Sequence, residues 1–186
     1  VMYGLAGIIC EGFPIANAFP AWFLQLGIGR VGVVPIPAII LIVVFLLAHF
    51  LMTYTTTGRS IYAIGGNTES ARLSGINVTK FYYIIYMIIG FFAAFAGVLS
   101  ISRYGSAPAS LGQGVEFRVV TGLLIGGVSM EGGEGSILGA FLGMLLMALI
   151  ANALTLFGID SNLQNVLIGC IMLASVAVDQ ANRSRQ

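Results

Sequence analysis

The chain has 186 residues and a formal net charge of +1, and 58% of its residues are apolar but only 8% are charged. An ordinary soluble domain carries about 25% charged residues, so this composition excludes a water-soluble fold of the same size. The chain also lacks a basic stripe, and we therefore expect no nucleic-acid partner. Its continuous apolar runs predict an all-α, polytopic transmembrane helix bundle in a lipid bilayer, because the strands of membrane barrels alternate in polarity.

The opening segment, residues 1–32, is apolar at first and then contains an acidic residue, two prolines and Trp22. This pattern predicts the remnant of an earlier helix, followed by a loop at the membrane interface. The chain begins with Val1 and has no signal-peptide pattern. We expect it to be N-terminally incomplete.

Four later segments are apolar enough to be membrane spans. A hydrocarbon core of about 30 Å requires about 20 helical residues. Three segments have about that length and a fourth is shorter, and they cover residues 33–52, 81–101, 137–157 and 163–178. Residues 115–130 have a short apolar part with several glycines, so they form either a short span or a re-entrant half-helix. The prediction is therefore about five spans plus a remnant.

The basic residues favour the spanning alternative for residues 115–130, because short cytoplasmic loops carry an excess of Lys and Arg. In that model five basic residues lie on one side of the membrane and three on the other. The group of five consists of Arg59, Arg72, Lys80, Arg183 and Arg185. The group of three consists of Arg30, Arg103 and Arg118. This model puts the loop at residues 53–80 and the C-terminal tail in the cytoplasm, and we prefer it.

Helix packing explains the small and polar residues in and beside the spans without a functional site. Gly135, Gly139 and Gly143 recur every four residues, which predicts a small-residue face for helix packing at the start of the span at 137–157. No acidic residue lies in mid-span, and the sequence has no phosphate-loop, zinc-protease or nucleophile-elbow motif. We expect no catalytic set, no metal site and no cofactor. Four polar residues at the ends of spans could touch a substrate, but helix packing explains each of them equally well. They are Glu116, Asn152, Gln164 and Asn165.

The loop at residues 53–80 is longer than usual connections between neighbouring helices, which marks it as functional or disordered. Gly65 and Gly66 have the backbone freedom for a turn. After them, Asn67 or Thr68 can cap a helix, Glu69 falls in its first turn, Arg72 follows on the same face, and Gly75 can end it. So short a helix requires a packing partner. Docking of another protein and a purely structural connector explain it equally well on these grounds.

The loop also carries a family resemblance. Its sequence TTTGRSIYAIGGNTESARLSGINV resembles the cytoplasmic loop of bacterial ABC-importer permeases of the ribose, galactose and arabinose type, in the branched-chain amino acid and sugar permease superfamily. Glu69, Ser70 and Ala71, followed by Gly75, are similar in spacing to the E-A-A-x-x-x-G pattern that such permeases present to their ATPase. The similarity continues through SRYGSAP, GVEF, IGGVSMEGGEGSILGAFLG and QNVLIG, and so covers essentially the whole chain.

The resemblance implies one transmembrane permease domain over residues 1–186, the C-terminal part of a longer permease, with a cytoplasmic coupling loop at 53–80. Such a subunit is not an enzyme. It moves a small sugar across the bacterial inner membrane, with a cytoplasmic ATPase cassette, a second permease subunit and a periplasmic sugar-binding protein as partners. The residues implied in ATPase coupling are Gly65, Gly66, Asn67, Glu69, Ala71, Arg72 and Gly75. The alternatives are a stand-alone channel or ion-coupled carrier, and a structural membrane scaffold.

Overall fold

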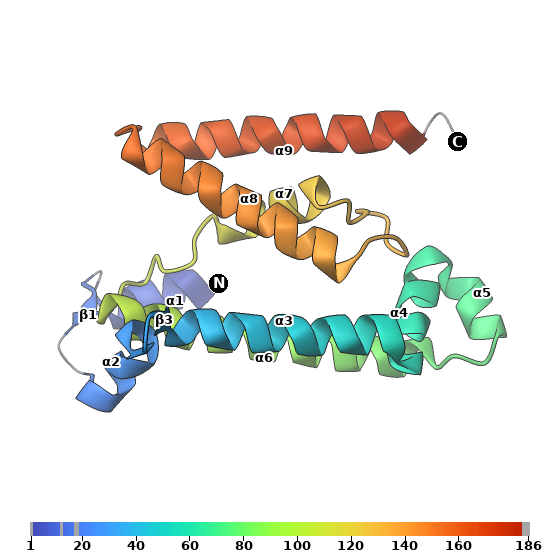
Figure 1. The fold of residues 1–186 in the computed structure, drawn as a ribbon, viewed down its shortest axis with the longest axis horizontal. Coiled ribbons are helices and arrows are strands. Elements are labelled where there is room, and N and C mark those ends of the chain that lie inside the picture. Colours follow the sequence, from blue (N-terminus) through green and yellow to red (C-terminus); the bar gives the residue numbers. More distant parts are fainter. Residues whose placement is uncertain (1, 12, 17–18, 184–186) are drawn as a thin grey trace. The chain divides into compact units, whose positions relative to one another are not determined.

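The computed structural model describes residues 2–11, 13–16 and 19–183, and they form a mostly helical chain (Figure 1). The chain divides into two compact units. The first consists of Val1–Leu46 and Thr79–Gln113, and the second of Leu47–Val78 and Gly114–Gln186.

The first unit contains the opening segment and most of two long helices. Its elements in chain order are α1 (Met2–Ile9), β1 (Ile15–Ala16), α2 (Ala21–Ile28), β2 (Arg30–Val31), β3 (Val34–Pro35), the first part of α3 (Ile36–Tyr54), α6 (Val78–Tyr104) and β4 (Ser106–Ala107). Two antiparallel pairs, β1 with β4 and β2 with β3, organise the predicted interfacial loop.

Helix α2 is packed against α6 through a small residue. A Cβ atom on Gly27 would overlap the backbone of Arg103, and the fully buried Ser102 donates a hydrogen bond to the Phe23 carbonyl. The sequence predicted a loop here from an acidic residue, two prolines and Trp22, and α2 indeed has no side-chain cap at Pro20. Tertiary contact with α6 therefore stabilises a helix that local signals do not predict.

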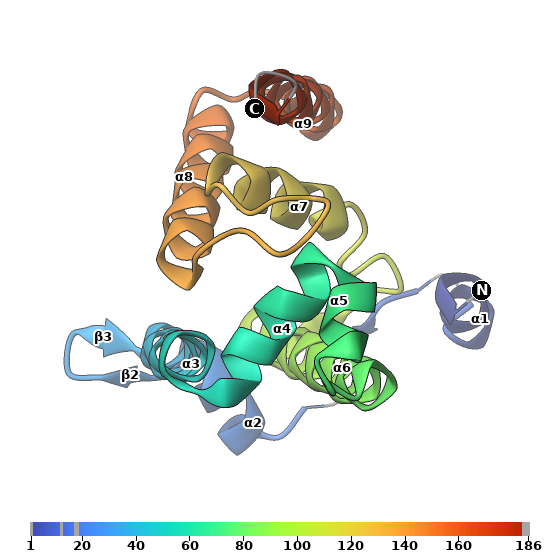
Figure 2. The same ribbon diagram turned by 90° about the vertical axis from the view of Figure 1, so that its right-hand side faces the viewer.

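The second unit contains the last part of α3 and the remaining helices, which are α4 (Thr56–Gly66), α5 (Thr68–Leu73), α7 (Val115–Ile125), α8 (Ile137–Leu156) and α9 (Ser161–Arg183). Helix α7 lies against both α8 and α9, and α4 lies against α5 (Figure 2). The second unit therefore joins the predicted coupling loop with the C-terminal helices.

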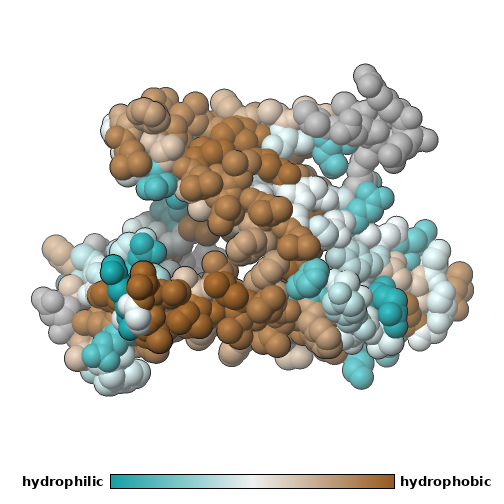
Figure 3. All heavy atoms as spheres, viewed as in Figure 1, coloured by the Kyte–Doolittle hydropathy of each residue, from teal (hydrophilic) through white to brown (hydrophobic). Residues whose placement is uncertain are grey.

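Three of the described helices are long and apolar enough to cross a membrane, namely α3, α6 and α8, with 19, 27 and 20 residues. They confirm the predicted helices at residues 33–52, 81–101 and 137–157. The segment predicted at 163–178 lies within the longer α9, whose apolar part is Asn162–Ala177. Hydrophobic residues cover α3 and α8, whereas more hydrophilic residues gather over α4 and α5 (Figure 3).

Helix α7 is shorter than the predicted segment at 115–130. It has 11 residues, and at 1.5 Å per residue it is about 16 Å long, roughly half of a hydrocarbon core. The helix ends because Gly127 adopts a left-handed φ of 76°. The amides of Gly127 and Val128 donate to the carbonyls of Leu124 and Leu123, which is the pattern of a Schellman C-cap.

Candidate functional site

The loop at residues 53–80 contains two helices where the sequence predicted one. Gly65 and Gly66, predicted to form a turn, are the last residues of α4, so that part of the prediction is wrong. Thr55 caps α4 by accepting a hydrogen bond of 3.2 Å from the amide of Gly58. The sequence feature that could have predicted α4 is Thr55 as a cap, followed by apolar residues at helical spacing. One of these apolar residues, Ile64, is only 4% exposed.

Asn67 separates the two helices and serves both of them. Its extended backbone ends α4, and its side-chain Oδ1 accepts a hydrogen bond of 2.8 Å from the amide of Ser70 in the first turn of α5. Capping satisfies a backbone donor that the helix itself leaves unpaired. The predicted short helix is confirmed as α5, Thr68–Leu73, and of the two expected caps it is Asn67 that caps it.

Gly75 ends α5, as the sequence predicted. Its φ is 84°, and its amide donates to the Arg72 carbonyl over 3.0 Å. The amide of Ile76 donates to the Ala71 carbonyl over 3.1 Å, which completes a Schellman C-cap. The left-handed backbone conformation at this position favours glycine, because a residue with a Cβ atom would be strained there.

The exposure of α5 divides it into an inner and an outer face. Ala71 is its only buried residue, at 4% exposed. Glu69, Arg72 and Leu73 are exposed, and their spacing of three and four places them on one side of the helix, which we call the outer face of α5. Leu73 is 81% exposed and was not singled out from the sequence. The signal that could have found it is a large apolar side chain on a short polar helix outside the spans.

Helix α4 lies against the segment that precedes α8, residues 131–135, which we call the glycine loop. A Cβ atom on Gly65 would lie 2.5 Å from the amide nitrogen of Gly133, so the two backbones are in direct contact. The Tyr62 hydroxyl donates a hydrogen bond of 3.0 Å to the Gly135 carbonyl. Next to this contact is a surface hollow of about 270 Å³, lined by Gly65, Gly66, Glu131, Gly132, Gly133 and Glu134.

The predicted packing glycines lie in two different environments. Gly139 and Gly143 are on α8, where an added Cβ would overlap the carbonyl oxygens of Gly126 and Gly122 respectively. Gly135 precedes the α8 cap residue Ser136 and has a φ of 136°, so assigning it to the same helical face was wrong. The reason is that α8 begins at Ile137, after Ser136 accepts a hydrogen bond from the amide of Gly139.

The four polar residues suggested for a substrate pathway are spread over three helices. Glu116 is exposed in the first turn of α7, Asn152 is exposed on α8, and Asn165 is exposed on α9. Gln164 is buried, and its amide donates to the Ile159 carbonyl over 2.9 Å and to the Thr155 hydroxyl over 3.4 Å. These bonds tie the start of α9 to the end of α8, which gives Gln164 a structural role.

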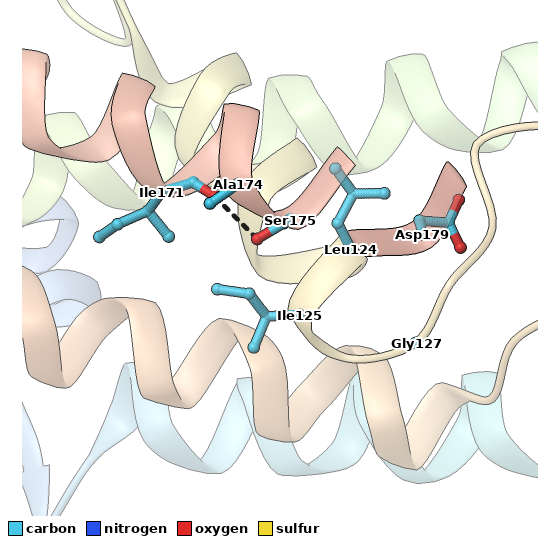
Figure 4. Close-up of a pocket in the computed structure, with 7 residues that line it drawn as sticks. All are labelled: Leu124, Ile125, Gly127, Ile171, Ala174, Ser175 and Asp179. Atoms are coloured by element: carbon cyan, nitrogen blue, oxygen red, sulfur yellow. Dashed lines mark hydrogen bonds between the residues drawn. The ribbon is translucent and has the colours of Figure 1, made fainter. Parts of the chain in front are cut away.

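An open hollow of about 480 Å³ lies beside the end of α7 (Figure 4). It is lined from α7 and the turn after it by Leu124, Ile125 and Gly127, and from α9 by Ile171, Ala174, Ser175 and Asp179. The Ser175 hydroxyl donates to the Ile171 carbonyl of its own helix over 2.8 Å. The lining is therefore mainly apolar, as expected for a groove between membrane helices.

Comparison with known proteins gives one family match and several relatives. The family model described as "Branched-chain amino acid transport system / permease component" matches residues 6–176. The ribose import permease protein RbsC of Escherichia coli (strain K12) is 36% identical over 185 residues, which cover 96% of this chain and 57% of the relative. RbsC of Bacillus subtilis (strain 168) is 35% identical over 181 residues, which cover 97% of this chain and 56% of the relative.

A third relative is the xylose transport system permease protein XylH of Escherichia coli (strain K12), which is 39% identical over 152 residues. That alignment covers 82% of this chain and 39% of the relative. The chain therefore spans little more than half the length of the relatives that it matches most fully. No solved structure matches it.

Proposed function

Because the chain belongs to the family of branched-chain amino acid transport system permease components, we propose that it is the membrane-spanning part of an ATP-binding-cassette importer. It translocates a small sugar across the bacterial inner membrane and hydrolyses no ATP itself. The names of its relatives, which are ribose and xylose permeases, support the sugar assignment. The ATP hydrolysis that drives transport takes place in a separate ATPase subunit.

The observation that carries the proposal is α5, a six-residue helix between two candidate spans, capped at both ends and with its outer face uncovered. Six residues are too few for a stable helix in water, so packing and caps must hold α5 in shape. A helix held in shape with Glu69, Arg72 and Leu73 exposed suits docking to another protein. We assign the outer face of α5 to the cytoplasmic ATPase cassette.

The residues around this face have supporting roles in the coupling loop. Asn67 and Gly75 set the two ends of α5, and Ala71 allows it to lie close to the rest of the second unit. Gly65 and Gly66 belong to α4, on which α5 packs. ATP-driven closure of two cassettes would move α5 as a rigid body between two positions.

Chain connectivity supports five crossings of the membrane. Helix α6 has 27 residues, about 40 Å, and so carries the chain from the coupling loop to the opposite side. The glycine loop nevertheless lies against α4 in the coupling loop. The chain must therefore return between Tyr104 and Glu131, and only α7 with its non-helical flanks is available for that crossing. Non-helical backbone is tolerated at membrane depth where protein covers it, and α7 lies against α8 and α9.

The other partners follow from the same assignment. A second permease subunit, identical or different, completes the pathway, and a periplasmic binding protein delivers the sugar on the side opposite α5. Residues 1–186 then form one permease domain of a longer subunit, with residues 53–80 as its cytoplasmic coupling loop. The polar groups Glu116, Asn152 and Asn165 are the exposed ones available to a passing sugar.

The test is co-purification of the permease with its cassette, together with sugar uptake into proteoliposomes. Glu69→Lys reverses a charge on the outer face of α5 and should abolish cassette binding and ATP-driven uptake, while the permease still inserts into the membrane. Arg72→Ala should weaken binding in the same direction. Uptake of ribose or xylose that continues without any cassette would overturn the proposal in favour of a channel or ion-coupled carrier.

Labelled branched-chain amino acids serve as the comparison substrate. The family description names them, whereas the relatives' names specify ribose and xylose. We expect uptake of one of the sugars, and no uptake of leucine above background. Uptake of leucine alone would overturn the sugar assignment but would leave the assignment of α5 intact.

A further inference from the structure

We infer that α4 and the glycine loop transmit the movement of α5 to α7 and α8. This inference rests on the proposed function. The coupling loop is covalently joined to α3 and α6, and these joints are the obvious route for movement. The contact between α4 and the glycine loop provides a second route, which leads to different helices.

At Gly65, Gly132 and Gly133 the two segments touch through their backbones. A Cβ atom on Gly65 would lie 2.5 Å from the Gly133 nitrogen, and one on Gly133 would lie 2.5 Å from the Cα of Gly66. A Cβ atom on Gly132 would lie 3.0 Å from the Gly65 carbonyl oxygen. Direct backbone contact transmits displacement well, because no flexible side chain can change rotamer to absorb it.

A hydrogen bond holds the same two segments together. The half-buried Tyr62, one turn before Gly66 on α4, donates its hydroxyl hydrogen to the Gly135 carbonyl over 3.0 Å. Gly135 directly precedes Ser136, which caps α8. A pull on α4 therefore acts two residues before Ile137, where the candidate span α8 begins.

The glycine loop belongs to a tight turn, residues 126–136, which joins α7 to α8. The amide of Ser129 donates to the Glu134 carbonyl over 3.1 Å, which closes the turn on itself. At its α7 end the amide of Val128 donates to the Leu123 carbonyl, and at its α8 end Ser136 Oγ accepts from the amide of Gly139. Both ends of the turn are thus hydrogen-bonded at the helix that each end adjoins, which restricts movement of the turn relative to α7 and α8.

The division of the chain into units agrees with this route, because units are defined by residues that lie close together. The coupling loop falls in the unit that contains α7, α8 and α9, although its two ends lead in sequence to α3 and α6. Glycine contacts then join α7 to α8, at Gly122 with Gly143 and at Gly126 with Gly139. We conclude that α4, α5, α7 and α8 move together when a cassette moves α5.

The experiment compares Gly65→Ala with Gly66→Ala in the assembled transporter in proteoliposomes. Both add one methyl group to the same end of α4. At Gly65 the methyl meets the Gly133 nitrogen at 2.5 Å, whereas nothing lies within 4 Å of it at Gly66. We measure cassette co-purification, ATP hydrolysis and sugar uptake for each variant, and we use the ratio of sugar to ATP as the readout of coupling.

Gly65→Ala should keep the cassette and hydrolyse ATP, but should lower the sugar transported per ATP by about tenfold, within the usual range of coupling between sites. Gly66→Ala should show a clearly smaller loss. Tyr62→Phe keeps the ring and removes only the hydrogen bond to Gly135, so it should lower the same ratio without disturbing the fold. This variant keeps the test decisive if Gly65→Ala fails to reach the membrane.

Three outcomes would overturn the inference. Equal coupling in the Gly65→Ala and Gly66→Ala variants, or unchanged coupling in Tyr62→Phe, would show that the contact transmits nothing. Loss of cassette binding in Gly65→Ala would show that the contact holds α5 in place instead of transmitting its movement. A wild-type permease that binds no cassette would overturn the proposed function and this inference together.

Discussion

Helices α5 and α7 are both short, and they end in the same way but are held by different forces. Each ends in a Schellman C-cap with a left-handed glycine, Gly75 for α5 and Gly127 for α7. Helix α5 has a side-chain cap from Asn67 and buries only Ala71. Helix α7 has no side-chain cap at Gly114, yet it lies against two neighbouring helices.

The difference shows that a short helix can be either a docking element or a packed part of the bundle, depending on what stabilises it. Local hydrogen bonds keep α5 in shape while its outer face stays exposed, which suits a docking element. Packing keeps α7 in shape, and its residues Thr121 and Gly122 are buried. Substitutions in α7 and its neighbour α8 should therefore act on the stability of the permease, and those in α5 should act on coupling.

The largest effect is expected from Gly143→Ala on α8. The added methyl would overlap the Gly122 carbonyl oxygen on α7, and overpacking of this kind typically costs about 1–3 kcal/mol. We expect a lower melting temperature in detergent and less folded permease in the membrane. Gly169→Ala on α9 is the control, because nothing lies within 4 Å of a methyl there. Equal melting temperatures for the two variants would contradict packing of α7 on α8.

Gly75→Ala should have the next largest effect, and on coupling more than on folding. A non-glycine residue in the left-handed conformation costs about 1–2 kcal/mol, and here the strain falls on the end of α5. Sugar uptake should fall while the amount of permease in the membrane stays normal. Gly112→Ala is matched, because Gly112 has a φ of 86° and equally open surroundings but lies outside α5. Similar uptake by the two variants would refute the link between α5 and transport.

Asn67→Ala should have a smaller effect of the same kind. It removes the side-chain cap of α5, and loss of such a cap costs about 1 kcal/mol. Cassette affinity should fall, as measured by titration of the detergent-solubilised permease. Asn67→Asp retains a capping oxygen and should restore most of the affinity. Failure of Asp to rescue would mean that Asn67 acts through a contact other than the cap.

Leu73→Ala should have the smallest effect on the permease itself. Its side chain is 81% exposed, so its truncation removes almost no packing and should leave the melting temperature within error. Cassette affinity should nevertheless fall, since a buried apolar anchor at an interface contributes more than its polar rim. Val33→Ala, at 93% exposed in the first unit, is the control for lost apolar surface. A drop in stability without a drop in affinity would remove Leu73 from the docking face.

The coupling loop shows how far sequence prediction extends in this protein. Asn67, Glu69, Arg72 and Gly75 predicted α5, because caps and helix ends depend on residues within one or two turns of each other. The same method missed α4, whose stability depends on α5 and on the distant glycine loop. It also missed α2, which is held by Ser102 and Arg103 far along the chain.

The candidate site shows the same limit. The sequence identified the residues of α5 but gave no reason to link Gly65 with Gly133, or Tyr62 with Gly135. These pairs are far apart in the chain, and a glycine carries no side chain whose chemistry would point to its neighbour. The pattern of Gly135, Gly139 and Gly143 was correct in spacing but included a residue that precedes the helix.

The sequence by itself determined that the chain crosses a membrane, where its long apolar helices lie, and that a polar capped helix interrupts them. Each of these rests on hydrophobicity or on hydrogen bonds between near neighbours. The tertiary structure alone decided the existence of α2 and the contact that joins the coupling loop to the C-terminal helices. These features depend on close approach of backbones that are distant in sequence, and no local pattern encodes that approach.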